Sequence, residues 1–201
     1  MTTNQPDYQS AEKFALDLLT NELPEGLYYH NLAHTVGEVL PAMEEFADQE
    51  EITGEPRSLL RIATLYHDVG FINAYDEHVQ EGILIVRSEL PGFGFSPDQI
   101  NTICSMIMAT HLPQTPTNLL EMILADADLS ILGRSNFSQR NELLLRERIA
   151  YGRGMSEQQW YCDQLSFLEQ HRYFTRPARD TRGPVKRRNI QMLNQRLAVS
   201  S

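Results

Sequence analysis

Residues 65–70 have the sequence Leu-Tyr-His-Asp-Val-Gly, which places His67 and Asp68 at the end of a predicted amphipathic helix. Adjacent residues on a helix point about 100° apart, so these two side chains can share one ion only near a helix end. An imidazole beside a carboxylate forms a mixed N/O ligand pair, which suits zinc, manganese, iron or another first-row metal better than calcium. A lone His-Asp dipeptide arises often by chance, so the significance of this pair depends on the rest of the chain.

Helical periodicity extends outward from this stretch in both directions, and no run alternates as a strand would. The helix that ends at Asp68 begins at Pro56, a residue favoured in the first turn. The segment 174–185 is expected to be a flexible loop because it contains Pro177, Gly183 and Pro184. The pattern predicts an all-α, single-domain irregular bundle with a single core. The predicted helices are 10–21, 32–48, 56–68, 76–89, 97–111, 118–132, 136–150, 156–170 and 186–197.

Composition is that of a globular protein, with 201 residues, 41% hydrophobic and 22% charged. No apolar run approaches the roughly 20 residues that cross a bilayer, and residues 1–10 lack the apolar segment of a signal peptide. We therefore expect a cytoplasmic protein without a membrane partner. Cys104 and Cys162 lie far apart and are expected to be reduced.

The net charge of −10 is unevenly distributed. Residues 1–171 carry −17, whereas residues 172–201 carry eight Lys/Arg and one acid, for a net +7. The acidic body argues against nucleic-acid binding, which depends on cationic contacts to phosphate. The basic segment could clamp a phosphorylated ligand, pack on the acidic body, or be solvated.

The predicted helix 118–132 is apolar almost all round, yet it contains Asp126 and Asp128. Burying an ionised carboxylate costs several kcal/mol unless it is paired or bound to a cation. A metal ion would satisfy both carboxylates, and so would Arg134 or an arginine of the C-terminal segment. His111 lies on the same apolar face as Ile100, where it is either a site residue or a hydrogen-bonded core histidine.

Five ordered motifs together resemble the HD superfamily, closest to its predicted metal-dependent phosphohydrolases. The resemblance covers roughly residues 28–133. The motifs are Tyr29-His30-Asn31-x-x-His34, Leu65-Tyr66-His67-Asp68-Val69-Gly70, Glu77-His78, Ala109-Thr110-His111 and Asp126-Ala127-Asp128-Leu129-Ser130-Ile131-Leu132-Gly133.

The resemblance implies a divalent metal (manganese, zinc, iron, nickel, cobalt or magnesium, as one or two ions) held by His34, His67, Asp68 and a later aspartate. Residues 127–130 are similar to the metal aspartate motif of cyclic-nucleotide phosphodiesterases, which favours Asp128. Residues 124–126 are similar to stringent-response hydrolases, which favours Asp126. Helical-wheel position puts Asp128 nearer the apolar centre, so we expect Asp128 to be the ligand.

The remaining site residues are assigned catalytic roles by the same resemblance. Asp126 would support a ligand or orient water, and His78 and His111 would bind a second ion, the phosphate or the attacking water. His30 would be a ligand with His34 or would orient one. Arg134, Arg140, Arg146 and Arg153 are candidate phosphate clamps.

The resemblance implies metal-dependent hydrolysis of a phosphoester, with a nucleotide or another small phosphorylated metabolite as substrate. Two alternatives keep the same ligands: a non-catalytic nucleotide-sensing domain, and a di-iron oxygenase that uses His78 and His111. The expected organisation is an N-terminal helical segment 1–27, an HD domain 28–171 and a basic segment 172–201. A homodimer is compatible with the sequence, which does not decide the oligomeric state.

Overall fold

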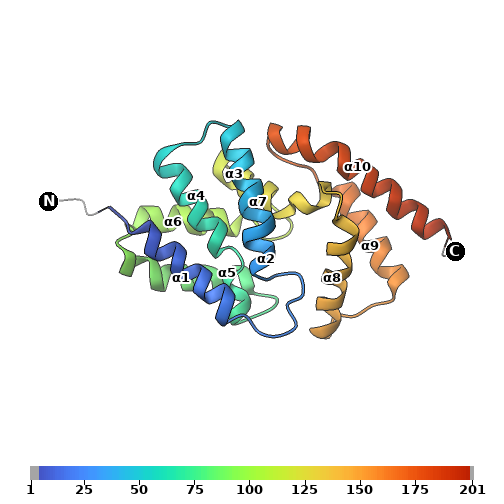
Figure 1. Ribbon diagram of the computed structural model, residues 1–201, viewed down its shortest axis with the longest axis horizontal. Coiled ribbons are helices and arrows are strands. Elements are labelled where there is room, and N and C mark those ends of the chain that lie inside the picture. Colours follow the sequence, from blue (N-terminus) through green and yellow to red (C-terminus); the bar gives the residue numbers. More distant parts are fainter. Residues whose placement is uncertain (1–4, 200–201) are drawn as a thin grey trace.

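A computed structural model describes residues 5–199, and within these residues the chain forms helices and no β-strand (Figure 1). The all-α prediction is confirmed. The long helices are α1 (Tyr8–Asn21), α3 (Leu40–Gln49), α4 (Gly54–Tyr66), α5 (His78–Glu89), α6 (Pro97–Met108), α7 (Leu119–Asp128), α8 (Phe137–Ala150), α9 (Glu157–Gln170) and α10 (Arg176–Val199). Short elements lie between them: α2 (Leu32–His34), the π-helical turn η1 (Thr35–Val39), and the 3₁₀ turns η2 (Val69–Ile72), η3 (Leu90–Phe93) and η4 (Leu129–Gly133). None of the described helices is long and apolar enough to cross a membrane.

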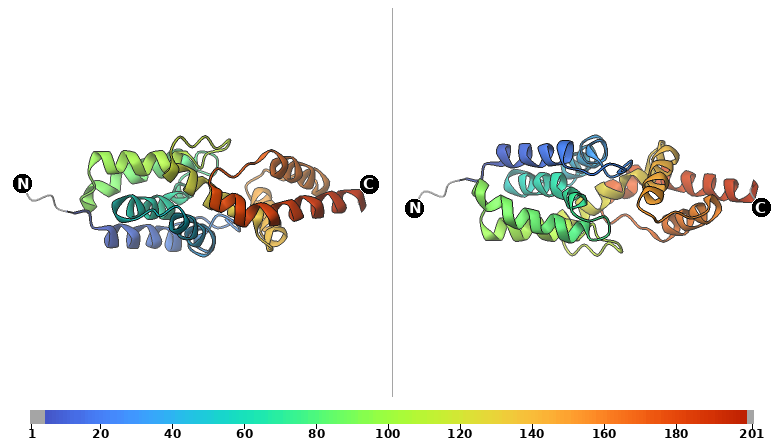
Figure 2. Two further views of the ribbon diagram at one scale, coloured as in Figure 1. Left: turned by 90° about the horizontal axis from the view of Figure 1, so that it is seen from above. Right: turned by 90° about the horizontal axis from the view of Figure 1, so that it is seen from below.

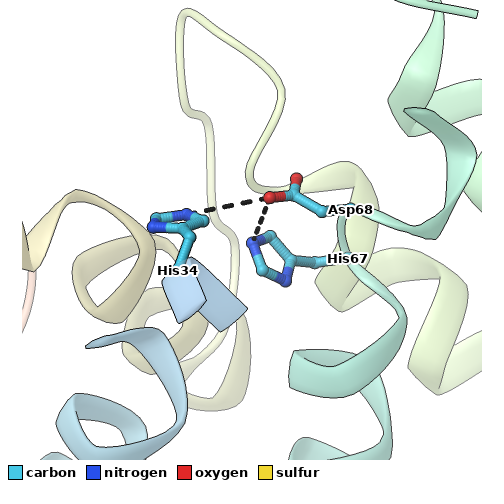
Figure 3. Close-up of side chains that lie close together, drawn as sticks. All are labelled: His34, His67 and Asp68. Carbon is cyan, nitrogen blue, oxygen red and sulfur yellow. Dashed lines mark ion pairs between the residues drawn. The ribbon is translucent and has the colours of Figure 1, made fainter. Parts of the chain in front are cut away.

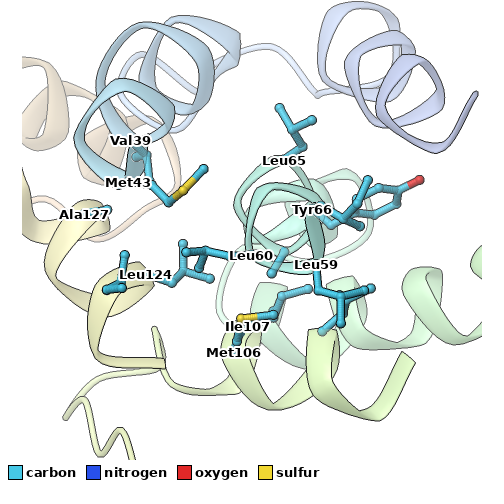
Figure 4. Packing of buried hydrophobic residues seen from close by; sticks show 14 of the residues in the cluster. Val39, Met43, Leu59, Leu60, Leu65, Tyr66, Met106, Ile107, Leu124 and Ala127 are labelled. Atoms are coloured by element: carbon cyan, nitrogen blue, oxygen red, sulfur yellow. The ribbon is translucent and has the colours of Figure 1, made fainter. Parts of the chain in front are cut away.

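Two clusters of buried hydrophobic residues replace the single core that the sequence predicted. The larger cluster joins α1 and α3–α7, and Figure 4 shows Val39, Leu60, Ile107 and Leu124 meeting in it. The smaller cluster joins Tyr29 and η4 to α8, α9 and α10, through Phe137, Trp160, Leu168 and Leu193 among others. Figure 2 shows the resulting elongated molecule, with the three C-terminal helices at one end. After Gly133 the chain contributes mainly to the smaller cluster, although Tyr173 and Ala178 are part of the larger one.

Gly70 allows η2 to lie directly against the start of α5. A Cβ atom added at Gly70 would sit 1.8 Å from the carbonyl oxygen of His78 and 2.4 Å from the amide nitrogen of Gly82. Both atoms belong to the backbone of α5 and cannot rotate away. The close approach therefore holds residues 67–72 in one position relative to α5, next to His67 and Asp68.

Replacing Gly70 with alanine is expected to lower the free energy of unfolding by about 3 kcal/mol or more, because the added methyl group must displace backbone rather than a side chain. The matched control is Gly37→Ala in η1, where an added Cβ meets nothing within 4 Å. That variant is expected to change stability by less than about 1 kcal/mol. Urea unfolding measures both, and equal stabilities of the two variants would contradict the packing described.

The C-terminal segment corrects the prediction of a flexible loop over 174–185. Helix α10 begins at Arg176 and passes through Pro184. Pro177 lies in the first turn, where its missing N–H removes no helical bond. Thr175 supports the start of the helix, with its Oγ1 accepting from the amide of Ala178 at 3.3 Å. The helix continues past Pro184 because tertiary packing outweighs its local penalty: Asn189 donates to the carbonyls of η4, and Leu193 is buried in the smaller cluster.

Candidate metal centre

His67 and Asp68 lie where α4 ends and η2 begins. This is the helix end that the two adjacent side chains need in order to share one ion. Helix α4 ends at Tyr66, and Asp68 already has the non-helical angles φ −110° and ψ 2°. This change of direction brings His67 Nε2 within 3.2 Å of Asp68 Oδ2. His67 Nδ1 lies 2.7 Å from the carbonyl oxygen of Thr64 and must donate to it, so Nε2 keeps its lone pair for a ligand.

His34 reaches the same point from α2. Asn31 caps this helix, accepting from the amides of Ala33 and His34. The π-helical turn that follows His34 places Glu38 against the ring, with 3.1 Å between Glu38 Oε2 and His34 Nδ1. A carboxylate on Nδ1 fixes the proton there and directs the Nε2 lone pair inward. Isolated π turns are frequent at functional sites.

Asp128 completes the cluster from the last turn of α7. Its Oδ1 lies 3.3 Å from His34 Nε2 and 3.6 Å from His67 Nε2. Asp68 Oδ2 lies 3.7 Å from His34 Nε2, and Figure 3 shows His34, His67 and Asp68 pointing toward one another. Four donors about 2.1 Å from one ion in a tetrahedral arrangement would be roughly 3.4 Å apart. The separations of Asp68 and Asp128 from the two histidines therefore fit a shared cation.

Two of these atoms have no hydrogen-bond partner. His67 Nε2 and Asp68 Oδ2 are both fully buried; they lie 3.2 Å apart as an ion pair, but neither forms a hydrogen bond of good geometry within the described residues. A buried polar atom without a partner costs about 1–3 kcal/mol, more when charged. Both atoms belong to the group that could hold a metal ion, His34, His67 and Asp68, whose candidate ligand atoms all lie within 4.8 Å of one another. The residues present thus fit the divalent ion that the sequence predicted.

The electrostatics of the cluster also call for a cation. Burial favours the neutral acid of Asp128, yet hydrogen bonds with His34 and His67 lower its pKa to about 2. Burial likewise favours the neutral His67 ring, but Asp68 and Asp128 outweigh it and raise the pKa of His67 well above its usual value. Two ionised carboxylates thus hold protons on the imidazoles when no metal competes for them. Binding of a metal must release these protons.

Asp126 does not join this cluster. Its oxygens accept from the amides of Phe174 and Thr175 and from the Thr175 hydroxyl, at 2.7–3.1 Å. Its side chain therefore anchors the start of α10, some 48 residues further along the chain. Asp126 thus lies apart from Asp128, and the supporting or water-orienting role expected for it from the sequence stays a prediction. Helix geometry explains the difference, because residues two apart on α7 point to different faces.

A cavity of about 500 Å³ opens beside the cluster, and Asp68 and Asp128 form part of its wall. His78 and His111 line it as well, so the structure brings both near the site. The ring of Phe71 stacks on His78 at 3.9 Å between centroids, and the Tyr75 carbonyl binds His78 Nδ1 at 3.0 Å. His111 is exposed at the rim. Their catalytic or second-ion roles stay predictions.

His30, which is partly exposed, pairs with the buried Glu147, a contact that the sequence did not indicate. His30 Nδ1 lies 2.5 Å from Glu147 Oε1, and Glu147 Oε2 accepts the amides of Tyr29 and His30. Burial opposes ionisation of Glu147, but the bonds from His30 and these amides lower its pKa. His30 lines the cavity and stacks on Phe71. The pair spans 117 residues, so no local pattern predicts it.

The arginine clamps expected from sequence are mostly occupied elsewhere. Arg134 binds Ser130 and the Glu38 carbonyl, Arg146 lies over the Tyr28 ring, and Arg153 pairs with Asp76. Arg140 does line the cavity, where it forms an ion pair with Glu38. Arg148, which was not among the candidates, also lines the cavity, and its buried Nε has no partner among the described residues.

Comparisons with known proteins agree with this geometry. The model of the HD domain family matches residues 29–130, just over half of the chain. The fold is similar to a crystal structure described as a predicted HD superfamily hydrolase from an uncultured Thermotogales bacterium. The TM-score is 0.60 at 20% identity, covering 94% of this chain and 92% of that one. A search of curated proteins finds no match. All the residues of the cluster lie within the matched range.

Proposed function

Because the chain belongs to the HD domain family, we propose that it is a metal-dependent phosphohydrolase that hydrolyses a phosphoester of a small metabolite, namely a nucleotide. One observation carries the proposal: the Nε2 and Oδ atoms of His34, His67, Asp68 and Asp128 converge at the wall of a cavity, and two of these buried atoms form no hydrogen bond within the described residues. These four residues would hold a divalent cation. Such an ion would act as a Lewis acid toward the phosphate and would lower the pKa of bound water.

The histidines of the cavity supply proton transfer in this proposal. Glu147 accepts from Nδ1 of His30, which leaves His30 Nε2 to take a proton from the attacking water and return one to the leaving oxygen. Burial lowers the pKa of His78, so its ring is neutral at pH 7. The bond to Tyr75 occupies Nδ1 of His78, and Nε2 accepts a hydrogen bond or binds a second ion. Arg148, which lines the cavity, would contact the phosphate oxygens in this proposal.

The far part of the cavity supports a nucleotide as the substrate. We call it the apolar chamber, and its walls are Ile131, Leu132, Phe137, Leu144, Met155, Trp160 and Phe167. Two buried polar atoms in the cavity wall have no partner: Trp160 Nε1, on a residue 2% exposed, and Asn141 Oδ1, on a residue 4% exposed. The indole N–H can only donate and the amide oxygen can only accept. A ligand that satisfies both atoms needs an acceptor for the Trp160 N–H and a donor for the Asn141 oxygen. A nucleobase has both groups on a flat ring that suits the apolar walls.

Trp160→Phe and Asn141→Ala are expected to raise KM for nucleotide substrates by about tenfold or more, since each leaves a hydrogen-bonding atom of the base unpaired. Hydrolysis of p-nitrophenyl phosphate, which has no base, is expected to stay within about twofold. Tyr161→Phe is the control, because Tyr161 lies in the same hydrophobic cluster without lining the cavity. Equal losses on both kinds of substrate would count against base recognition in the chamber.

The activity itself is tested with purified protein and added manganese, against p-nitrophenyl phosphate, bis-p-nitrophenyl phosphate and a nucleotide panel. The proposal expects phosphate release that depends on the metal. Nucleotide binding without turnover across metals would favour a sensor instead. Bound iron with oxygen consumption would favour the oxygenase.

A further inference from the structure

A second recess lies between the end of α9 and helix α10, which run side by side in Figure 1. We call it the basic groove. It has a volume of about 410 Å³ and shares no lining residue with the cavity at the metal centre. Its cationic lining residues are Arg172, Arg179, Lys186 and Arg187, and no aspartate or glutamate of the described chain lines it. These four cations belong to the basic segment 172–201, whose net charge is +7.

Lys186 is the central residue of the groove. It is only 7% exposed, yet its ammonium has no carboxylate partner among the described residues. Its Nζ donates to the carbonyl oxygen of His171, at 2.5 Å, and to Nδ1 of the same residue, at 3.0 Å, and lies 5.6 Å from the centre of the Tyr173 ring. A buried ammonium without an anion is costly. Burial and the neighbouring Arg172 accordingly lower the pKa of Lys186 to about 8.

His171 adds an unsatisfied donor to the same wall. An ammonium has no lone pair, so His171 Nδ1 must accept the bond from Lys186. The neutral ring then carries its proton on Nε2, which is buried and has no partner in the described structure. The charged and imidazole side chains of this wall offer N–H donors, and no side-chain carboxylate of the described chain lines it. Such a wall is suited to an anion.

The arginines of the groove differ from the others in the basic segment. Arg176, Arg182 and Arg196 form ion pairs with Asp180, Glu45 and Glu157. By contrast, Arg172 and Arg179 bond only to backbone carbonyls, and Arg187 is exposed at the groove without an ion pair in the described part of the chain. Asp126 influences Arg179 electrostatically, but its oxygens are bound to residues 174 and 175.

We propose that the basic groove binds the phosphate group of a small phosphorylated metabolite, at a site separate from the metal centre. A tetrahedral dianion can accept from Lys186, from His171 Nε2–H and from the guanidinium forks together. The ligand is small because the recess is bounded, and the acidic body disfavours a polyanion such as nucleic acid.

Isothermal titration of the full chain with inorganic phosphate tests the site, with sulfate and chloride compared at constant ionic strength. Wild-type protein is expected to bind one phosphate more per chain than Lys186→Met protein, and chloride is expected not to saturate the groove. Arg187→Gln is expected to weaken the groove phosphate by about tenfold. Phosphate bound at the metal centre is common to all variants and cancels in the comparison.

Arg188→Gln is the matched control, because Arg188 is an exposed neighbour on the same helix that does not line the groove. It is expected to leave phosphate binding unchanged. Equal stoichiometry in wild-type and Lys186→Met protein would overturn the proposal. Equal weakening by Arg187→Gln and Arg188→Gln would also overturn it, since diffuse charge rather than a site would then attract the anion.

Discussion

Replacing Asp68 with alanine is expected to abolish metal binding and to lower phosphohydrolase activity by at least about 10³-fold. Asp68 Oδ2 is a buried oxygen without a hydrogen-bond partner, 3.2 Å from His67 Nε2 and 3.7 Å from His34 Nε2. Removing it takes away one of the two negative charges that balance the cation. The activity depends on the ion, so both properties should be lost together.

Elemental analysis of the purified variant and its rate of phosphate release measure the two effects. Asp163→Asn is the control, because Asp163 also lines the cavity but is exposed and distant from the cluster in sequence. It is expected to keep the metal and most of the activity. An Asp68→Ala protein that retains full metal content and turnover would show that these residues are not ligands.

Replacing Glu147 with glutamine is expected to lower kcat by between about 10² and 10⁴ while leaving metal content unchanged. The amide keeps the shape of the side chain but loses the charge that orients His30. Glu147 is fully buried, and its nearest ring nitrogen belongs to His30, at 2.5 Å. The decrease in kcat should therefore arise from misplacement of His30, and His30→Ala should lower kcat by a similar factor.

Tyr75→Phe distinguishes positioning of His30 from general support of the fold. The Tyr75 hydroxyl also donates to Glu147, at 3.3 Å, and its loss leaves the bond to His30 in place. This variant is expected to retain kcat within about threefold. Partial rescue of His30→Ala by added imidazole would support proton transfer at this position. A Glu147→Gln enzyme with unchanged kcat would contradict the role.

The sequence predicted well those features of the fold and site that depend on local residue spacing. Apolar spacing located most of the helices. The choice of Asp128 over Asp126 rested on helical-wheel position, and the structure brings Asp128 to the two histidines. Glu38 was missed, although its i+4 spacing from His34 on a helix would have indicated contact.

What the sequence could not provide were contacts between distant segments. Glu147 meets His30 across 117 residues, and Asp126 meets residues 174 and 175 across 48 or 49. The same limit explains the error at α10. Pro184 and Gly183 indicate a loop locally, but packing against η4, where a Cβ at Gly133 would lie 2.4 Å from the Arg182 carbonyl, keeps the segment helical.

Crystals grown with manganese, with diffraction recorded on both sides of the manganese absorption edge, test the central claim most directly. We predict an anomalous peak enclosed by Nε2 of His34, Nε2 of His67, Oδ2 of Asp68 and Oδ1 of Asp128, about 2.1 Å from each. Anomalous density elsewhere, with these four side chains bonded only to one another or to water, would contradict it.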